Sequence, residues 1–155
     1  MRPRVEIIVE HPGLPVALKP ARELVCRVAE EETLSLKALN VILTGDRRLQ
    51  NLHRDYLNDD TPTDVITFDL SEPGRPGVEG EIYISVERAR AQAAEFGAAP
   101  EAEIARLIIH GMLHLKGYDD RTGPEQRKMR EREEHYLQRY GKLLRFLPVK
   151  TGKNS

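Results

Sequence analysis

The chain has 155 residues and a net charge of −1, which fits one domain of ordinary size and gives no overall attraction to nucleic acid. Cys26 is the only cysteine, so a disulfide framework within the chain is excluded and a reducing compartment is indicated. The N-terminus lacks the apolar stretch of a signal peptide, and no apolar run approaches the ~20 residues that span a bilayer. We therefore expect a cytoplasmic protein with no membrane partner.

Periodicity and turn residues predict four strands and five helices. Segments rich in β-branched and apolar residues predict strands at 5–10, 36–45, 64–70 and 81–86. Apolar residues at three- and four-residue steps predict helices at about 16–32, 47–57, 87–96, 101–116 and 124–140. Asp46 is a plausible N-cap for the second helix, which places Leu49, Leu52, Tyr56 and Leu57 on one side.

This order of elements predicts an α+β fold in a single domain. We expect a four-stranded mixed sheet covered by about five helices, with a metal site at the end of one helix. The domain is expected to span residues 1–148, followed by a disordered tail over residues 149–155.

The segment HGMLHLKGYDD, residues 110–120, contains the candidate metal ligands. His110 and His114 are four residues apart, so on a helix they share one face and can bind one Zn²⁺. Gly117 can end the helix and turn the chain back, and Asp120 then follows within reach of the same ion. Three protein ligands and one open position are what a catalytic zinc requires.

The spacing invites comparison with the metzincin motif H-E-x-x-H-x-x-G-x-x-H, in which the glutamate is the general base of peptide hydrolysis. Gly111 occupies the position of that glutamate here. A peptidase is therefore disfavoured.

A second motif, TPTDVITF at 61–68, precedes and enters a predicted strand. It permits two interpretations. It is either an ordinary strand entry with an Asx-type turn, or a rigid loop that presents Thr63, Asp64 and Thr67 beside the metal.

Together these segments resemble the YbeY family of bacterial rRNA-maturation endoribonucleases. The family signature H-G-x-L-H-L-x-G-Y-D-H differs from HGMLHLKGYDD only at its last position. A second family signature is a tyrosine followed eight residues later by the aspartate of P-T-D-V-[LI]-[ST]-F. Tyr56 and PTDVITF correspond to it here. The segment GEIYIS at 80–85 resembles the family strand G-D-I-x-I-S. The final helix, with Glu125, Met129 and Glu133, also resembles the family pattern, so the resemblance covers roughly residues 36–140.

The resemblance implies one Zn²⁺ per chain, held by His110, His114 and Asp120 as the catalytic metal site, and a zinc-dependent endoribonuclease specific for single strands. It implies a role in maturing the 3′ end of small-subunit rRNA and in ribosome quality control. The partners implied are ribosomal RNA and the ribosome or a small-subunit ribosomal protein. Cleavage by activated water and cleavage by the RNA 2′-OH both remain open.

Two departures from the family pattern concern this site. Asp120 stands where the family has a third histidine; aspartate is an accepted zinc ligand but adds a negative charge, and Asp119 is the alternative ligand. Leu57 stands where many members have an arginine that is thought to contact RNA. Arg54, one helical turn earlier, is a candidate replacement, and we group it with Thr63 and Asp64 as expected substrate-binding residues.

Two other functions share the same residues. One is a metal-dependent hydrolase of another substrate, and the other is a non-catalytic ribosome-associated factor with a structural zinc. Residues 121–155 carry ten Lys and Arg against four Glu, a balance of +6. This basic end either contacts phosphate or is a solvated helix face with a polar tail.

Overall fold

A four-stranded mixed sheet forms the centre of the molecule. The computed structural model describes residues 2–11, 16–59, 61 and 63–146, and the account of the fold is restricted to them. The strands are β1 (Arg4–Val9), β2 (Leu36–Thr44), β3 (Val65–Asp69) and β4 (Val78–Ser85). Their order is β1-β2-β4-β3, with the first three parallel and β3 antiparallel to β4, so β3 lies at the edge of the sheet. The prediction of a mixed four-stranded sheet in an α+β domain is confirmed.

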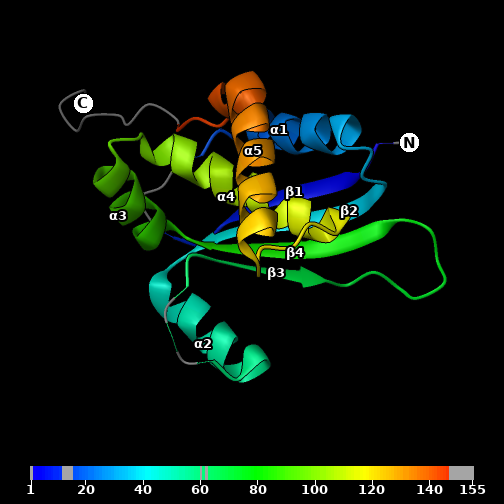
Figure 1. Cartoon of the computed structure of the whole chain (residues 1–155), viewed down its shortest axis with the longest axis horizontal. Coiled ribbons are helices and arrows are strands. Elements are labelled where there is room, and N and C mark those ends of the chain that lie inside the picture. Colours follow the sequence, from blue (N-terminus) through cyan, green and yellow to red (C-terminus); the bar gives the residue numbers. More distant parts are fainter. Residues whose placement is uncertain (1, 12–15, 60, 62, 147–155) are drawn as a thin grey trace, which may run out of the picture.

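Five α-helices are present in the described part of the chain. They are α1 (Leu18–Glu31), α2 (Asp46–Leu57), α3 (Val86–Phe96), α4 (Pro100–Lys116) and α5 (Gly123–Tyr140), and a short 3-10 turn follows α5. Figure 1 shows α1, α3, α4 and α5 on one face of the sheet and α2 on the other. Parallel strands need a crossover connection, and α1 supplies it between β1 and β2. Among the described helices, none is both long and apolar enough to cross a membrane.

The helix α4 is the core helix of the domain. Its sides pack against the sheet and against the neighbouring helices, so apolar residues surround it almost completely. Those that are buried include Ile104, Leu107, Ile108, Ile109, Met112 and Leu113.

Two glycines let α4 approach the sheet closely. A Cβ atom on Gly111 would lie 2.7 Å from Ile82 Cδ1 on β4, and one on Gly80 would lie 2.8 Å from Leu115 Cδ1 on α4. Because real Cβ atoms do not come this near, only glycine permits the observed spacing. This spacing sets how far the last turns of α4 lie from β3 and β4.

Several predicted details of the fold are wrong or lie outside the described residues. Gly45 is the N-cap of α2, and Asp46 is its first residue; the Asp46 carboxylate accepts a hydrogen bond from Ser85 Oγ at 2.7 Å instead of capping the helix. Of the residues predicted to share one side of α2, Leu49 is buried, whereas Tyr56 and Leu57 are 69% and 52% exposed. The strand predicted at 81–86 spans Val78–Ser85, because pairing with β2 extends its start by three residues. The expected tail, 149–155, lies outside the described residues.

Candidate metal centre

Three side chains meet at the C-terminal end of α4. His110 and His114 lie one turn apart on the same face of the helix, and Asp120 comes from the loop that follows it. The two Nε2 atoms are 3.1 Å apart, and Asp120 Oδ2 lies 3.6 Å from that of His110 and 3.5 Å from that of His114. One nitrogen of each ring and one carboxylate oxygen therefore form a small triangle.

The size of the triangle fits a metal ion. Ligand atoms bound to a tetrahedral zinc at 2.0–2.2 Å are separated by about 3.3–3.6 Å along each edge of the tetrahedron. The three separations between the ligand atoms here, 3.1, 3.5 and 3.6 Å, lie near this range. Two neutral imidazoles and a carboxylate are also a donor set that zinc accepts, so these residues could hold a metal ion.

The loop after α4 is shaped to return Asp120 to the two histidines. Gly117 ends the helix with φ +116°, in the left-handed region that favours glycine, and its N–H donates to the carbonyls of Leu113 and His114. Tyr118 N–H then donates to Leu113 O at 3.0 Å, which completes the turn. The helix ending that the sequence predicted at Gly117 is confirmed.

The start of α5 fixes the other end of the same loop. Thr122 and Glu125 form a capping box, in which the Thr122 hydroxyl accepts from Glu125 N–H and the Glu125 carboxylate accepts from Thr122 N–H at 3.0 Å. Gln126 Nε2 donates to Asp120 O at 3.0 Å. Asp119, the alternative ligand, turns its carboxylate to the N–H of Asp120, and the triangle does not include it.

Gly111 faces the sheet and not the histidine triangle. Besides Ile82, a Cβ atom there would meet Thr67 Oγ1 at 2.9 Å, so no larger side chain fits between α4 and the sheet. A glutamate base at this position, as in metzincin peptidases, has no room. The geometry therefore agrees with the sequence in disfavouring a peptidase.

The triangle opens onto a cleft of about 570 Å³ between α4, β3 and the end of α2. Thr63, Asp64 and Thr67 line the wall opposite the helix, as the second of the two interpretations of their motif requires. Leu57 also lines the cleft, together with two residues that the sequence did not single out for it, His53 and Arg121. Arg54 is not among its described lining residues and pairs with Asp55 at 3.1 Å.

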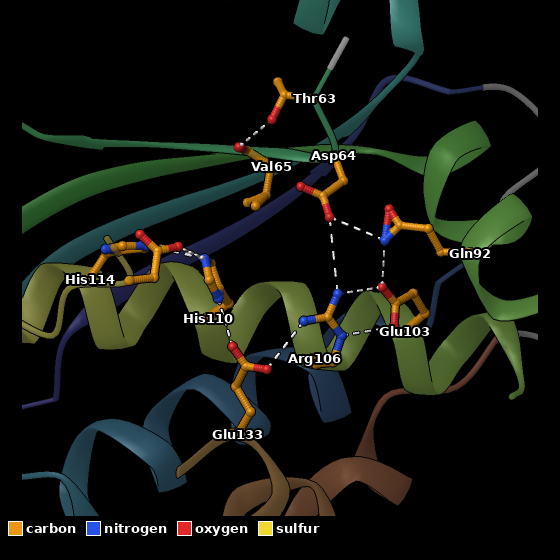
Figure 2. A network of polar contacts seen from close by, with 10 residues as sticks. Thr63, Asp64, Val65, Gln92, Glu103, Arg106, His110, His114 and Glu133 are labelled. Carbon is orange, nitrogen blue, oxygen red and sulfur yellow. Dashed lines mark hydrogen bonds and ion pairs between the residues drawn. The ribbon is translucent and has the colours of Figure 1, made fainter. Parts of the chain in front are cut away.

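A buried polar network lies behind the triangle, as Figure 2 shows. His110 Nδ1 is 2.6 Å from Glu133 Oε2 on α5, and Arg106 on α4 contacts the other oxygen of Glu133 at 3.1 Å. Arg106 also pairs with Glu103 at 2.6 Å, and hydrogen bonding to this carboxylate raises the pKa of the guanidinium above its ordinary value. Gln92 Nε2 donates to both Glu103 and Asp64, which joins the network to the cleft wall.

Comparisons with known proteins identify the family. The model of the family described as Endoribonuclease YbeY matches residues 16–141. The chain belongs to the YbeY family. Among curated members, the Endoribonuclease YbeY of Salinibacter ruber is 36% identical over 83% of this chain and 86% of its own length. The Endoribonuclease YbeY of Halalkalibacterium halodurans is 39% identical over 77% of this chain and 84% of its own length.

A solved structure extends the likeness to the fold. The solution structure of TM1509 from Thermotoga maritima superposes with a TM-score of 0.57 at 28% identity, covering 88% of this chain and 91% of that one. The family match begins at residue 16, some twenty residues before the segment in which the YbeY resemblance is visible by motif. The family assignment made from the motifs is confirmed.

Proposed function

We propose that the protein is a zinc-dependent endoribonuclease that cleaves single-stranded RNA in rRNA processing, including maturation of the 3′ end of small-subunit rRNA. The observation that carries this proposal is the triangle of His110, His114 and Asp120, whose edges match a tetrahedral zinc and which opens onto a cleft. The triangle belongs to a chain whose curated relatives are named endoribonucleases.

The ligand set favours a catalytic zinc over a structural one. Structural zinc sites are closed by four protein ligands, whereas catalytic sites keep one position open for water or substrate. The described residues supply three ligands, and the open side faces the cleft. This argues against the alternative of a non-catalytic ribosome-associated factor.

When bound, zinc would polarise a phosphoryl oxygen and activate water. Asp120 contributes a negative charge that a third histidine would not, which makes the site a weaker Lewis acid. The residues of the cleft would hold the RNA. Arg121, whose side chain is 83% exposed at the cleft mouth, is placed to contact a phosphate, and its contact should weaken with salt.

Thr63 and Asp64 would contact the sugar or base from the opposite wall. The Asp64 carboxylate can accept hydrogen bonds from RNA hydroxyl or amino groups, and Gln92 holds it in place at 3.1 Å. Leu57 can offer only an apolar contact where many family members have arginine. Arg54 remains a proposed RNA contact, which would require it to leave Asp55.

The test is metal content followed by RNA cleavage, on the wild type, Asp120→Ala and the control Asp119→Ala. We expect about one zinc per chain and cleavage of unstructured RNA in the wild type and in Asp119→Ala, and loss of both in Asp120→Ala. Zinc retained in Asp120→Ala would contradict the proposed ligand set. A wild-type protein that binds zinc but cleaves no RNA, while hydrolysing other phosphoesters, would favour the general hydrolase.

Two further measurements address mechanism and cellular role. Products with a 2′,3′-cyclic phosphate and a 5′-OH would show attack by the RNA 2′-OH, whereas products with a 5′-phosphate and a 3′-OH would show attack by water. In a strain that lacks its own YbeY protein, the wild type should restore correct 3′ ends of small-subunit rRNA and Asp120→Ala should not. Rescue by Asp120→Ala would support the alternative of a non-catalytic ribosome-associated factor. A ribosomal partner and a cytoplasmic location remain predictions.

A further inference from the structure

We propose that Glu133 is a positioning residue for the metal centre. It would fix the ring of His110 so that Nε2 presents a free lone pair to the metal, and Arg106 would hold Glu133 in place for this task. This inference rests on the metal site proposed above, but it concerns Glu133 and Arg106, which are not themselves among the proposed ligands.

The first support is the contact between His110 and Glu133. Nδ1 of the ring lies 2.6 Å from Glu133 Oε2, a short distance typical of a charge-assisted hydrogen bond. Because a carboxylate oxygen accepts a hydrogen bond, this contact favours the tautomer of His110 that carries its hydrogen on Nδ1 and leaves the lone pair of Nε2 free. Nε2 is the atom that points to His114 and Asp120, and it is the atom a metal would need.

The second support is that Glu133 has no freedom to turn away. It is 4% exposed, although α5 is otherwise a largely charged helix. Its other oxygen accepts from Arg106 Nη1 at 3.1 Å, so both carboxylate oxygens are occupied by donors from α4. A buried carboxylate without such partners would be costly, and each donor here belongs to the core helix.

The third support is the way Arg106 is itself held. Glu103 accepts from its Nε at 2.9 Å and from its Nη2 at 2.6 Å, a two-point contact that fixes the plane of the guanidinium. Nη2 also lies 4.0 Å from Asp64 Oδ2, at the entry to β3. One partly buried cation thus links the carboxylate that contacts His110 to a side chain of the cleft wall, as Figure 2 shows.

A glutamine at position 133 would break this arrangement with little change in shape. Its single amide oxygen can accept from His110 or from Arg106, and its NH₂ group then faces the donor that remains. The ring of His110 would lose either its partner or the preference for one tautomer. Partners of metal-bound histidines typically contribute 10–100-fold to metal affinity.

The experiment combines a spectroscopic readout with metal affinity. Two-dimensional ¹⁵N–¹H spectra of the histidine rings in the metal-free wild type should show His110 with the proton on Nδ1. Zinc affinity, measured by competition with a chromophoric chelator, should fall 10–100-fold in Glu133→Gln. It should stay unchanged in Glu134→Gln, a matched control that removes the same charge from the next, exposed residue of α5.

The outcomes separate this inference from the proposed function. A wild-type His110 with its proton on Nε2, or wild-type zinc affinity in folded Glu133→Gln, would overturn the positioning role. If Glu133→Gln does not fold, the tautomer of the wild type still decides. Loss of zinc affinity in Glu133→Gln together with a wild type that cleaves no RNA would keep the positioning role and reject the nuclease.

Discussion

Replacing Gly111 by alanine tests whether close contact between α4 and the sheet sets the geometry of the metal centre. The added methyl group would lie 2.7 Å from Ile82 Cδ1, 2.9 Å from Ile82 Cγ1 and 2.9 Å from Thr67 Oγ1. Ile82 is fully buried in β4, an inner strand. Either its side chain must change rotamer inside the packed core or the helix must move away from the sheet, and both cost free energy.

The expected loss of stability follows from two opposing effects. Overpacking a tight core costs about 1–3 kcal/mol, and three contacts below 3.0 Å place this site toward the upper end. Alanine is better than glycine inside a helix by roughly 1 kcal/mol. The net loss should be about 1–2 kcal/mol, which lowers Tm by about 2–8 °C in a domain of this size.

Thermal and urea unfolding of the metal-free protein would measure this loss. Gly123→Ala is the control, because a Cβ atom there meets only the flexible end of Arg127 at 3.5 Å. Ile82→Val should recover part of the loss in the double variant, since it removes the methyl group that clashes most closely. Equal or higher stability of Gly111→Ala, with no coupling to Ile82, would refute the reasoning that close packing holds α4 in place.

Three further predictions concern the surroundings of the metal centre. Thr122→Ala removes the capping box of α5 and should lower stability in urea unfolding by about 1 kcal/mol. Burial by itself raises the pKa of Glu32, but hydrogen bonds from Tyr118, Tyr136 and Arg132 outweigh it, so the pKa lies below its ordinary value of 4.5. The stabilisation from this carboxylate is therefore present above pH 4.5 and is lost as the pH falls through the lower pKa of the folded state. The difference in the free energy of unfolding between the wild type and Glu32→Gln should shrink over that acid range. A difference that stays the same between pH 7 and pH 3 would contradict this prediction. Removing zinc with a chelator should lower Tm, since zinc at 100 times its dissociation constant stabilises by about 2.7 kcal/mol, and the shift should be absent in His114→Ala.

The metal triangle was predictable because its signal is local. His110 and His114 are related by one helical turn, and Gly117 and Asp120 follow within six residues, so the spacing alone places three ligands together. The four strands and five helices were predictable for the same reason, from periodicities that extend over only a few residues. The ends of the elements were less accurate, as β4 shows, because pairing with β2 and not local sequence decides where it begins.

The environment of α2 was predicted less well. Its apolar residues were predicted to share one side, and of them only Leu49 is fully buried while Tyr56 is largely exposed. Periodicity shows which residues share a face, but it does not show how much of that face another element covers. Here α2 is the only helix of the described residues on its side of the sheet, and Tyr56 and Leu57 at its end stay largely exposed.

The polar network was not predictable from the sequence. Glu133 lies in the run RERE at 130–133, which is typical of a solvated helix face, and Arg106 and Glu103 resemble an ordinary i,i+3 surface pair. The burial of Glu133 depends on the packing of α5 against α4, where it contacts Arg106 and His110, which lie 27 and 23 positions earlier in the chain. One signal was available: Glu103 and Arg106 interrupt the otherwise apolar surface of the core helix, where unpaired charges are not tolerated.

The start and the middle of α5 act on different ligands of the same triangle. At its N-terminus, Thr122 and Gln126 hold the loop that presents Asp120. Three turns later, Glu133 contacts His110 from the opposite side. Because both contacts depend on the position of one helix, a shift of α5 would move Asp120 and release His110 together, while β1, β2 and β4 remain paired. We therefore expect substitutions that loosen α5, such as Thr122→Ala, to reduce the free energy of zinc binding by more than they reduce the free energy of unfolding. If the two free energies fall by equal amounts, the triangle is held by α4 and its loop alone.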